Sequence, residues 1–115
     1  MAFKRNTLLL AFTLCLGVIF GQNPCNSDIC VIQFNAGWNG ANGVSYLDDL
    51  TDCNTMSVNI EDGTWQQDYG IVVVPTVIVF NGKEVERFQA DISFKIAATR
   101  KEVQSIVDDI IYSDF

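Results

Sequence analysis

The sequence contains no histidine, and this absence excludes several classes of catalytic chemistry. Histidine is the usual general base near neutral pH and the commonest protein ligand of zinc. Catalysis by a Ser-His-Asp or Cys-His arrangement is therefore not expected. The sequence also lacks a C-x-x-C pair, because its four cysteines stand at positions 15, 25, 30 and 53. We accordingly expect neither a metal site nor a cofactor.

Basic residues are scarce as well. The 115 residues include 7 Lys+Arg against 14 Asp+Glu, which gives a formal net charge of −7, and no run of basic residues occurs. Nucleic acids and anionic membranes bind through basic surfaces, so neither is an expected partner. The charge favours a neutral or basic protein partner, and the length corresponds to one domain.

The N-terminal segment has the composition of a secretory signal. Lys4 and Arg5 precede an apolar run at 8–20, and the small residue Gly21 follows it. The run has about 13 residues, fewer than the roughly 20 that span a bilayer. We therefore predict a signal peptide at 1–21, a lead-in segment at 22–29 and a domain at 30–115, in a protein that is secreted or directed to the periplasm or cell envelope. An uncleaved membrane anchor is the alternative.

Strand and helix patterns alternate along the rest of the chain. Asn81-Gly82 predicts a hairpin, and Thr99 with Glu102 forms a capping box that predicts the start of a helix. The expected fold is α/β, with a four-stranded mixed sheet flanked by helices in the order β-α-β-α-β-β-α. The predicted strands are 30–34, 55–60, 72–80 and 83–88, and the predicted helices are 44–51, 64–69 and one that begins after Thr99.

Two segments carry a resemblance to the thioredoxin family. Residues 34–42 (FNAGWNGAN) resemble the family's F-x-A-x-W-C-G-P-C segment, and residues 69–83 (YGIVVVPTVIVFNGK) are similar to its Y-G-I-x-x-x-P-T-x-x-x-F-x-N-G-x segment. The resemblance implies a pared-down thioredoxin-like fold without the family's first strand and helix. It also implies that Pro75 follows a cis peptide bond.

The redox motif of the family is degenerate in this sequence. Asn39 and Asn42 occupy the positions of the two cysteines, and Gly40 and Ala41 lie between them. Thiol–disulfide exchange needs an attacking thiolate and a resolving thiol, and an amide supplies neither. Gln33 stands at the position of the family's buried acid. We expect no redox catalysis, and we expect Asn39 to act as a helix N-cap.

The resemblance also identifies a candidate binding groove. In the family, the residues matched by Trp38 and Pro75 line a groove that holds the extended backbone of a substrate, and Val74 and Thr76 flank the proline. An extended partner segment would then pair with the backbone at Val74. The alternative is that these residues only complete the local packing.

A second candidate surface follows the fourth predicted strand. Ile92, Phe94 and Ile96 alternate with Ser93 and Lys95, which predicts an additional edge strand or a bent continuation of the fourth strand. Its apolar face would either cover the core or provide a docking edge for another chain.

Removal of the signal leaves Cys25, Cys30 and Cys53, so one thiol stays unpaired within the chain. The positions predict a stabilising disulfide between Cys25 and Cys53, with Cys30–Cys53 as the alternative.

These observations favour an exported, redox-inactive protein that acts as a binding or assembly module for a protein partner or for further copies of itself. Two alternatives remain open. One is a thiol–disulfide oxidoreductase that uses the cysteines outside the motif, and the other is a structural subunit of a membrane-anchored or particle assembly.

Overall fold

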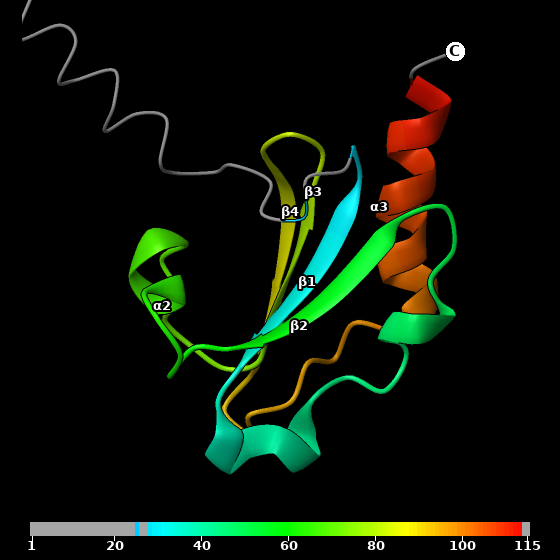
Figure 1. Ribbon diagram of the computed structural model, residues 1–115. Helices are drawn as coiled ribbons and strands as arrows, with labels where there is room; N and C mark the ends of the chain where they lie inside the picture. Colours follow the sequence, from blue (N-terminus) through cyan, green and yellow to red (C-terminus); the bar gives the residue numbers. More distant parts are fainter. Residues whose placement is uncertain (1–24, 26–27, 114–115) are drawn as a thin grey trace, which may run out of the picture.

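The structure is a computed structural model that describes Cys25 and residues 28–113 (Figure 1). The predicted signal segment 1–21 lies outside the described residues, as does most of the lead-in segment 22–29. The domain expected at 30–115 is described up to residue 113.

The centre of the molecule is a four-stranded mixed sheet in the order β2-β1-β3-β4. The strand β1 (Cys30–Asn35) pairs in parallel with β2 (Asn54–Asn59) and antiparallel with β3 (Thr76–Phe80). The strand β4 (Glu84–Gln89) returns antiparallel to β3. This arrangement confirms the predicted sheet, and it places β2 and β4 at the two edges (Figure 1).

Each face of the sheet carries its own hydrophobic cluster, because side chains alternate along β1 and β3. Cys30, Ile32 and Phe34 point to the face that α2 (Trp65–Asp68) covers through Trp65, together with Tyr69 directly after the helix. Val31 and the alternate residues of β3 point to the opposite face. That second face is covered by α3 (Arg100–Ser113), whose buried residues are Val103, Val107 and Ile110.

The start of α3 confirms the predicted capping box. The backbone N–H of Glu102 donates to Thr99 Oγ1 at 3.3 Å, and the backbone N–H of Thr99 donates to Glu102 Oε1 at 3.4 Å. The two residues thereby satisfy each other's backbone donors at the helix start.

The predicted hairpin is present with a longer turn than two residues. Residues 81–83 connect β3 to β4, and Gly82 has φ +80, a left-handed conformation that glycine adopts without strain. A register shift opposite Val79 and Phe80 forms a bulge in this strand pair.

The helix predicted at 44–51 is not formed. This region contains only the 3-10 turn η2 (Leu47–Asp49), preceded by the 3-10 helix η1 (Gly37–Asn42). The backbone N–H of Val44 donates to Gln33 Oε1 at 2.7 Å, and Gly43 is extended. Leu47 and Leu50 are still buried, but the acids at the end of the segment disfavour a helix C-terminus.

The third strand is shorter than predicted, because it begins at Thr76 and not at residue 72. The Val74–Pro75 peptide bond is cis, and proline has no backbone N–H to donate to the sheet. The stretch before Pro75 therefore leaves the sheet.

The strand predicted around residues 92–96 is also wrong. Asp91 accepts hydrogen bonds at Oδ1 from the backbone and side chain of Ser93, and the backbone N–H of Phe94 donates to the Asp91 carbonyl at 3.0 Å. Phe94 has φ +63, which is the left-handed region. Local side-chain bonding of this kind competes with strand pairing and makes a turn.

Candidate functional site: an amide cluster beside an apolar groove

Asn39 lies at the carboxyl end of β1 and is buried, with 3% of its surface exposed. Its Nδ2 group donates to Asn35 Oδ1 at 3.1 Å, to the Val74 carbonyl at 3.3 Å and to the Phe94 carbonyl at 3.3 Å. One side-chain amide thus connects η1 to the end of β1, to the cis-proline segment and to the 91–95 turn.

Two further asparagines complete the cluster. Asn42 Nδ2 donates to Asn39 Oδ1 at 2.8 Å, and Asn35 Nδ2 donates to the Asn39 carbonyl at 3.0 Å. The expectation that Asn39 caps a helix is wrong, because Ala36 occupies the N-cap of η1 and makes no side-chain cap bond. The Asn39 side chain points inward instead, to the carbonyl oxygens that meet there.

Gln33 on β1 is also engaged as a neutral amide. Its Nε2 donates to Ser57 Oγ at 3.3 Å, and its Oε1 accepts the Val44 N–H. Neither Gln33 nor Asn39 can ionise, so the site holds its geometry without a titratable group.

An apolar groove of about 210 Å³ lies next to the amide cluster. Trp38 and Phe94 stand at one side with their rings in edge-to-face contact at a centroid distance of 5.6 Å. The exposed fractions of Trp38, Phe94 and Val72 are 67%, 47% and 76%, which leaves a large apolar surface accessible. The remaining lining residues are Ile60, Gln66, Ile71, Val73 and Val74.

The backbone of Val74 is suited to pair with an extended segment. Its carbonyl accepts the Asn39 amide, whereas its N–H makes no hydrogen bond to another described residue. Pro75 and Thr76, which were predicted to take part in binding, are almost fully buried and do not line the groove.

The structure joins parts of the two predicted surfaces and separates others. Phe94, predicted for the edge strand, lies against Trp38 in the groove. Ile92 is 99% exposed and is absent from the groove lining, and Ile96 packs against the α3-side cluster. Phe94 therefore belongs with Trp38 and Val74, and the three apolar residues do not form one docking face.

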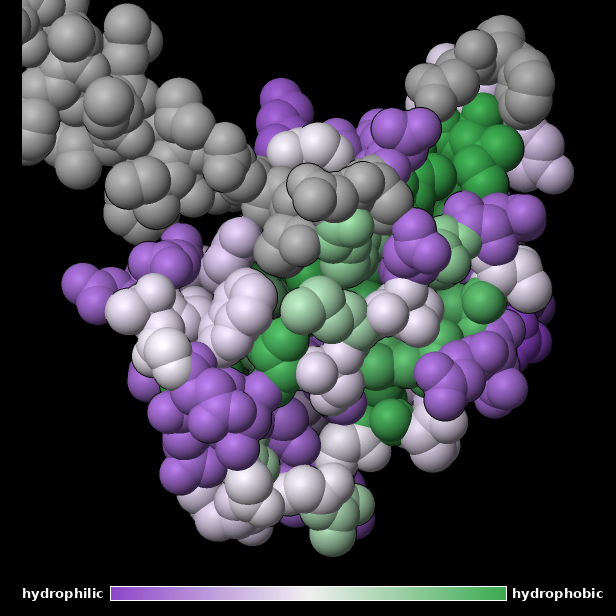
Figure 2. All heavy atoms as spheres, in the orientation of Figure 1, coloured by the Kyte–Doolittle hydropathy of each residue, from purple (hydrophilic) through white to green (hydrophobic). Residues whose placement is uncertain are grey.

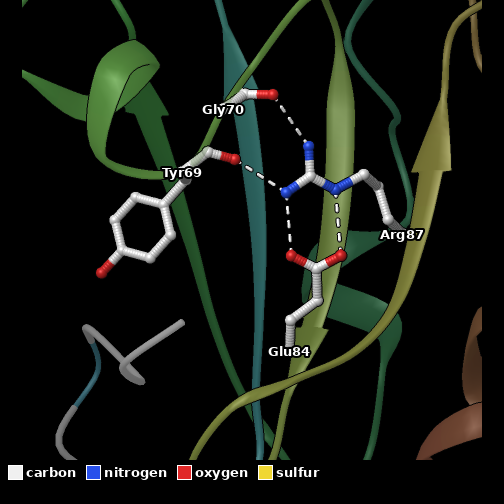
Figure 3. Close-up of polar contacts among 4 residues, drawn as sticks. All are labelled: Tyr69, Gly70, Glu84 and Arg87. Atoms are coloured by element: carbon white, nitrogen blue, oxygen red, sulfur yellow. Dashed lines mark hydrogen bonds and ion pairs between the residues drawn. The ribbon is translucent and has the colours of Figure 1, made fainter. Parts of the chain in front are cut away.

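One wall of the groove is held by a clamp that the sequence did not predict (Figure 3). Arg87 on β4 donates to the carbonyls of Tyr69 at 2.7 Å and Gly70 at 3.0 Å, and it forms a two-pronged ion pair with Glu84. Tyr69 and Gly70 lead directly into the lining residues that begin at Ile71. The sequence signal was weak, since a charged edge strand explains Arg87 equally well.

The cysteines lie at the other end of the sheet, and their predicted pairing is wrong. The disulfide joins Cys25 to Cys30, with a Cα–Cα distance of 6.1 Å, and Cys53 is a free thiol. The reason is the alternation of side chains. Cys30 and Cys25 pack on the α2 side of the sheet, whereas Cys53 packs on the α3 side. Burial, with Asp52 and Asp108 nearby, raises the pKa of the Cys53 thiol.

Comparisons with known proteins show the same architecture. No protein-family model and no curated protein matches the chain. Solved structures do: a thioredoxin variant from Halobacterium salinarum has a TM-score of 0.56 at 17% identity over 78% of this chain and 87% of that one. Mitochondrial thioredoxin 3 from Saccharomyces cerevisiae has a TM-score of 0.52 at 13% identity, covering 73% and 80%. The Fasciola hepatica thioredoxin has a TM-score of 0.50 at 21% identity, over 84% of this chain and 89% of that one.

Proposed function

From the thioredoxin-like fold of this chain, we propose that it is an exported, redox-inactive protein that binds an extended segment of a partner protein in the groove between Trp38, Val72 and Phe94. The observation that carries the proposal is the accessible apolar groove beside the Val74 N–H, which makes no hydrogen bond to another described residue. A hydrogen-bond donor and an apolar slot in one place suit an extended peptide.

The binding mode follows from the groove's chemistry. A carbonyl of the partner accepts the Val74 N–H, and an apolar side chain of the partner inserts against the rings of Trp38 and Phe94. Exposed aromatic residues supply large contact area at low entropic cost, which is why they dominate binding hot spots. The Arg87 clamp and the Asn39 amide hold the two walls before the partner arrives, so binding orders little of the chain.

Redox inactivity is supported by the Asn39 side chain at the site and by the state of the described cysteines. The side chain of Asn39 is buried and hydrogen-bonded at the position where a nucleophilic thiol would be needed. Among the described cysteines, Cys30 is fully buried in a disulfide, and the raised pKa of Cys53 lowers its thiolate fraction at neutral pH. These properties favour a binding role over an oxidoreductase that uses the remaining cysteines.

Export is supported by the N-terminal composition and by the disulfide, since disulfides persist in oxidising compartments. None of the described helices has the length and apolar character needed to cross a membrane. Mass spectrometry of the protein recovered from its native compartment tests export directly. We expect a mature N-terminus near residue 22, and peptides containing Lys4 on the mature protein would contradict the proposal.

The binding role is tested by selecting peptides from a random display library on the purified chain and measuring their affinity for variants. We expect Trp38→Ala and Phe94→Ser to weaken the selected peptides by about tenfold or more, as for central hot-spot residues. Ile92→Ser is the matched control, because Ile92 is more exposed than either and lies outside the groove. Selected peptides that tolerate both groove variants would refute the proposed site.

A further inference from the structure

The outer edge of β2 carries backbone donors that point away from the sheet. The N–H groups of Asn54 and Ile60 donate to β1-side carbonyls, at 3.0 Å to Ile29 and 2.8 Å to Asn35. Because donors alternate along a strand, the N–H groups of Thr55, Ser57 and Asn59 face outward. No described strand lies beside β2 on that side.

This edge lacks the features that usually block strand addition. Residues 54–59 (NTMSVN) contain no charged residue and no proline, and the pairing of β2 with β1 is regular. The opposite edge differs in its charge and its regularity, since β4 carries Glu84, Glu86 and Arg87 and is interrupted by a bulge. Charges and bulges protect an edge strand, so β4 is protected and β2 is open.

The surface beside the β2 edge is partly apolar. Met56 and Val58 are only partly buried, although they pack against the α2-side cluster. Figure 2 shows apolar side chains gathered over β1 and β2 between α2 and α3. A strand added to β2 would cover part of this surface.

Acidic residues stand at both ends of the same edge. Asp52 precedes β2, and Glu61 and Asp62 follow it, all exposed. The basic residues of the described chain lie elsewhere, on the β3–β4 turn, β4, the 91–95 turn and α3. An incoming strand with basic residues at its ends therefore meets complementary charge. A second copy pairing antiparallel would instead bring its Glu61 towards Asp52.

We infer that the β2 edge is a second docking site, separate from the groove, which adds an extended strand of a basic partner protein to the sheet. Backbone pairing with Thr55, Ser57 and Asn59 supplies the contact, and the acids at the two ends select the charge of the partner.

The test is amide hydrogen exchange on the full chain, with and without a capped synthetic peptide Lys-Val-Thr-Val-Thr-Val-Lys. We expect the peptide to slow exchange at Thr55, Ser57 and Asn59 by about tenfold or more, because the amides become hydrogen-bonded. The control peptide Glu-Val-Thr-Val-Thr-Val-Glu should give no protection. The double variant Asp52→Asn/Asp62→Asn should lose most of the protection that the basic peptide gives, with its fold and its β1 amide protection unchanged.

Three outcomes would overturn the inference. One is that neither peptide protects the outward amides. Another is that both peptides protect them equally, because charge then plays no part. The third is that these amides are already protected without peptide, which would mean that the edge is covered by this chain's own N-terminal segment or, if protection rises with protein concentration, by a second copy.

Discussion

The two ends of β1 differ in the chemistry that they hold. At the amino end, Cys25 and Cys30 form a disulfide. Cys53 lies nearby as a partly buried thiol with a raised pKa. At the carboxyl end, Asn35, Asn39 and Asn42 form an amide cluster beside the apolar groove. The described cysteines and the accessible groove therefore lie at opposite ends of β1.

The difference separates the covalent constraint on the fold from the accessible groove. The disulfide constrains the chain where it enters the sheet, and the amides order the loops that border the groove. Since side chains and not the fold determine function, the amides beside the groove and the disulfide at the other end allow different chemistry on one backbone arrangement.

The largest effect is expected at the amide cluster. Asn39→Ala removes the donor shared by Asn35, Val74 and Phe94 and leaves buried acceptors unpaired, which should cost about 3 kcal/mol of unfolding free energy. Urea denaturation measures the change. Asn42→Ala, which removes one bond from a less buried residue, should cost about 1 kcal/mol. Equal costs for the two variants would show that Asn39 is not the centre of the cluster.

A smaller effect is expected at the disulfide end. Cys25→Ser opens the short loop to Cys30 and should lower the unfolding free energy by about 2 kcal/mol, while peptide affinity at the groove stays the same. Thermal denaturation and calorimetric titration measure the two quantities. Loss of peptide affinity in Cys25→Ser would mean that the two ends are coupled.

Cys53 provides a pH-dependent comparison. Because burial raises its pKa, with Asp52 and Asp108 adding to the shift, the thiol stays protonated to higher pH in the folded protein. The contribution of the raised pKa to the free energy of unfolding is complete below the thiol pKa of the unfolded chain. It is lost as pH rises through the thiol pKa of the folded protein. The rate of alkylation by iodoacetamide should therefore rise at higher pH than in the denatured chain. Coincident pH profiles would contradict the assigned environment.

The smallest effect concerns asparagine ageing. Asn-Gly sequences occur at Asn39, Asn42 and Asn81, and little steric bulk protects them from deamidation. Asn81 is exposed in the β3–β4 turn, whereas Asn39 is buried and hydrogen-bonded. Peptide mapping of incubated protein should find Asn81 converted first and Asn39 last. Early conversion of Asn39 would indicate that the amide cluster opens readily.

Much of the sheet could be predicted because its signals are local. The apolar runs, the Asn81-Gly82 turn and the capping box at Thr99 each require only neighbouring residues. The disulfide partner could not be predicted this way, because it depends on which face of the sheet each cysteine reaches.

The candidate site was predicted only in part, because some of its residues come together through contacts that local patterns do not encode. Trp38 and Val74 came from the family resemblance, which carries long-range information. The place of Phe94 depended on the Asp91–Ser93 turn, which overrode an alternating pattern, and the missing helix at 44–51 depended on a distant contact with Gln33. Neither period-two spacing nor helical spacing reports such contacts.

The central claim is that the groove binds an extended partner segment without using any thiol. Calorimetric titration of one library-selected peptide tests this most directly. The peptide's affinity is compared, in the same buffer and at the same temperature, for wild type, Phe94→Ser and the triple variant Cys25→Ser/Cys30→Ser/Cys53→Ser. The account predicts unchanged affinity in the folded triple variant and at least about tenfold weaker binding in Phe94→Ser. Affinity that survives Phe94→Ser but disappears with the cysteines would contradict it.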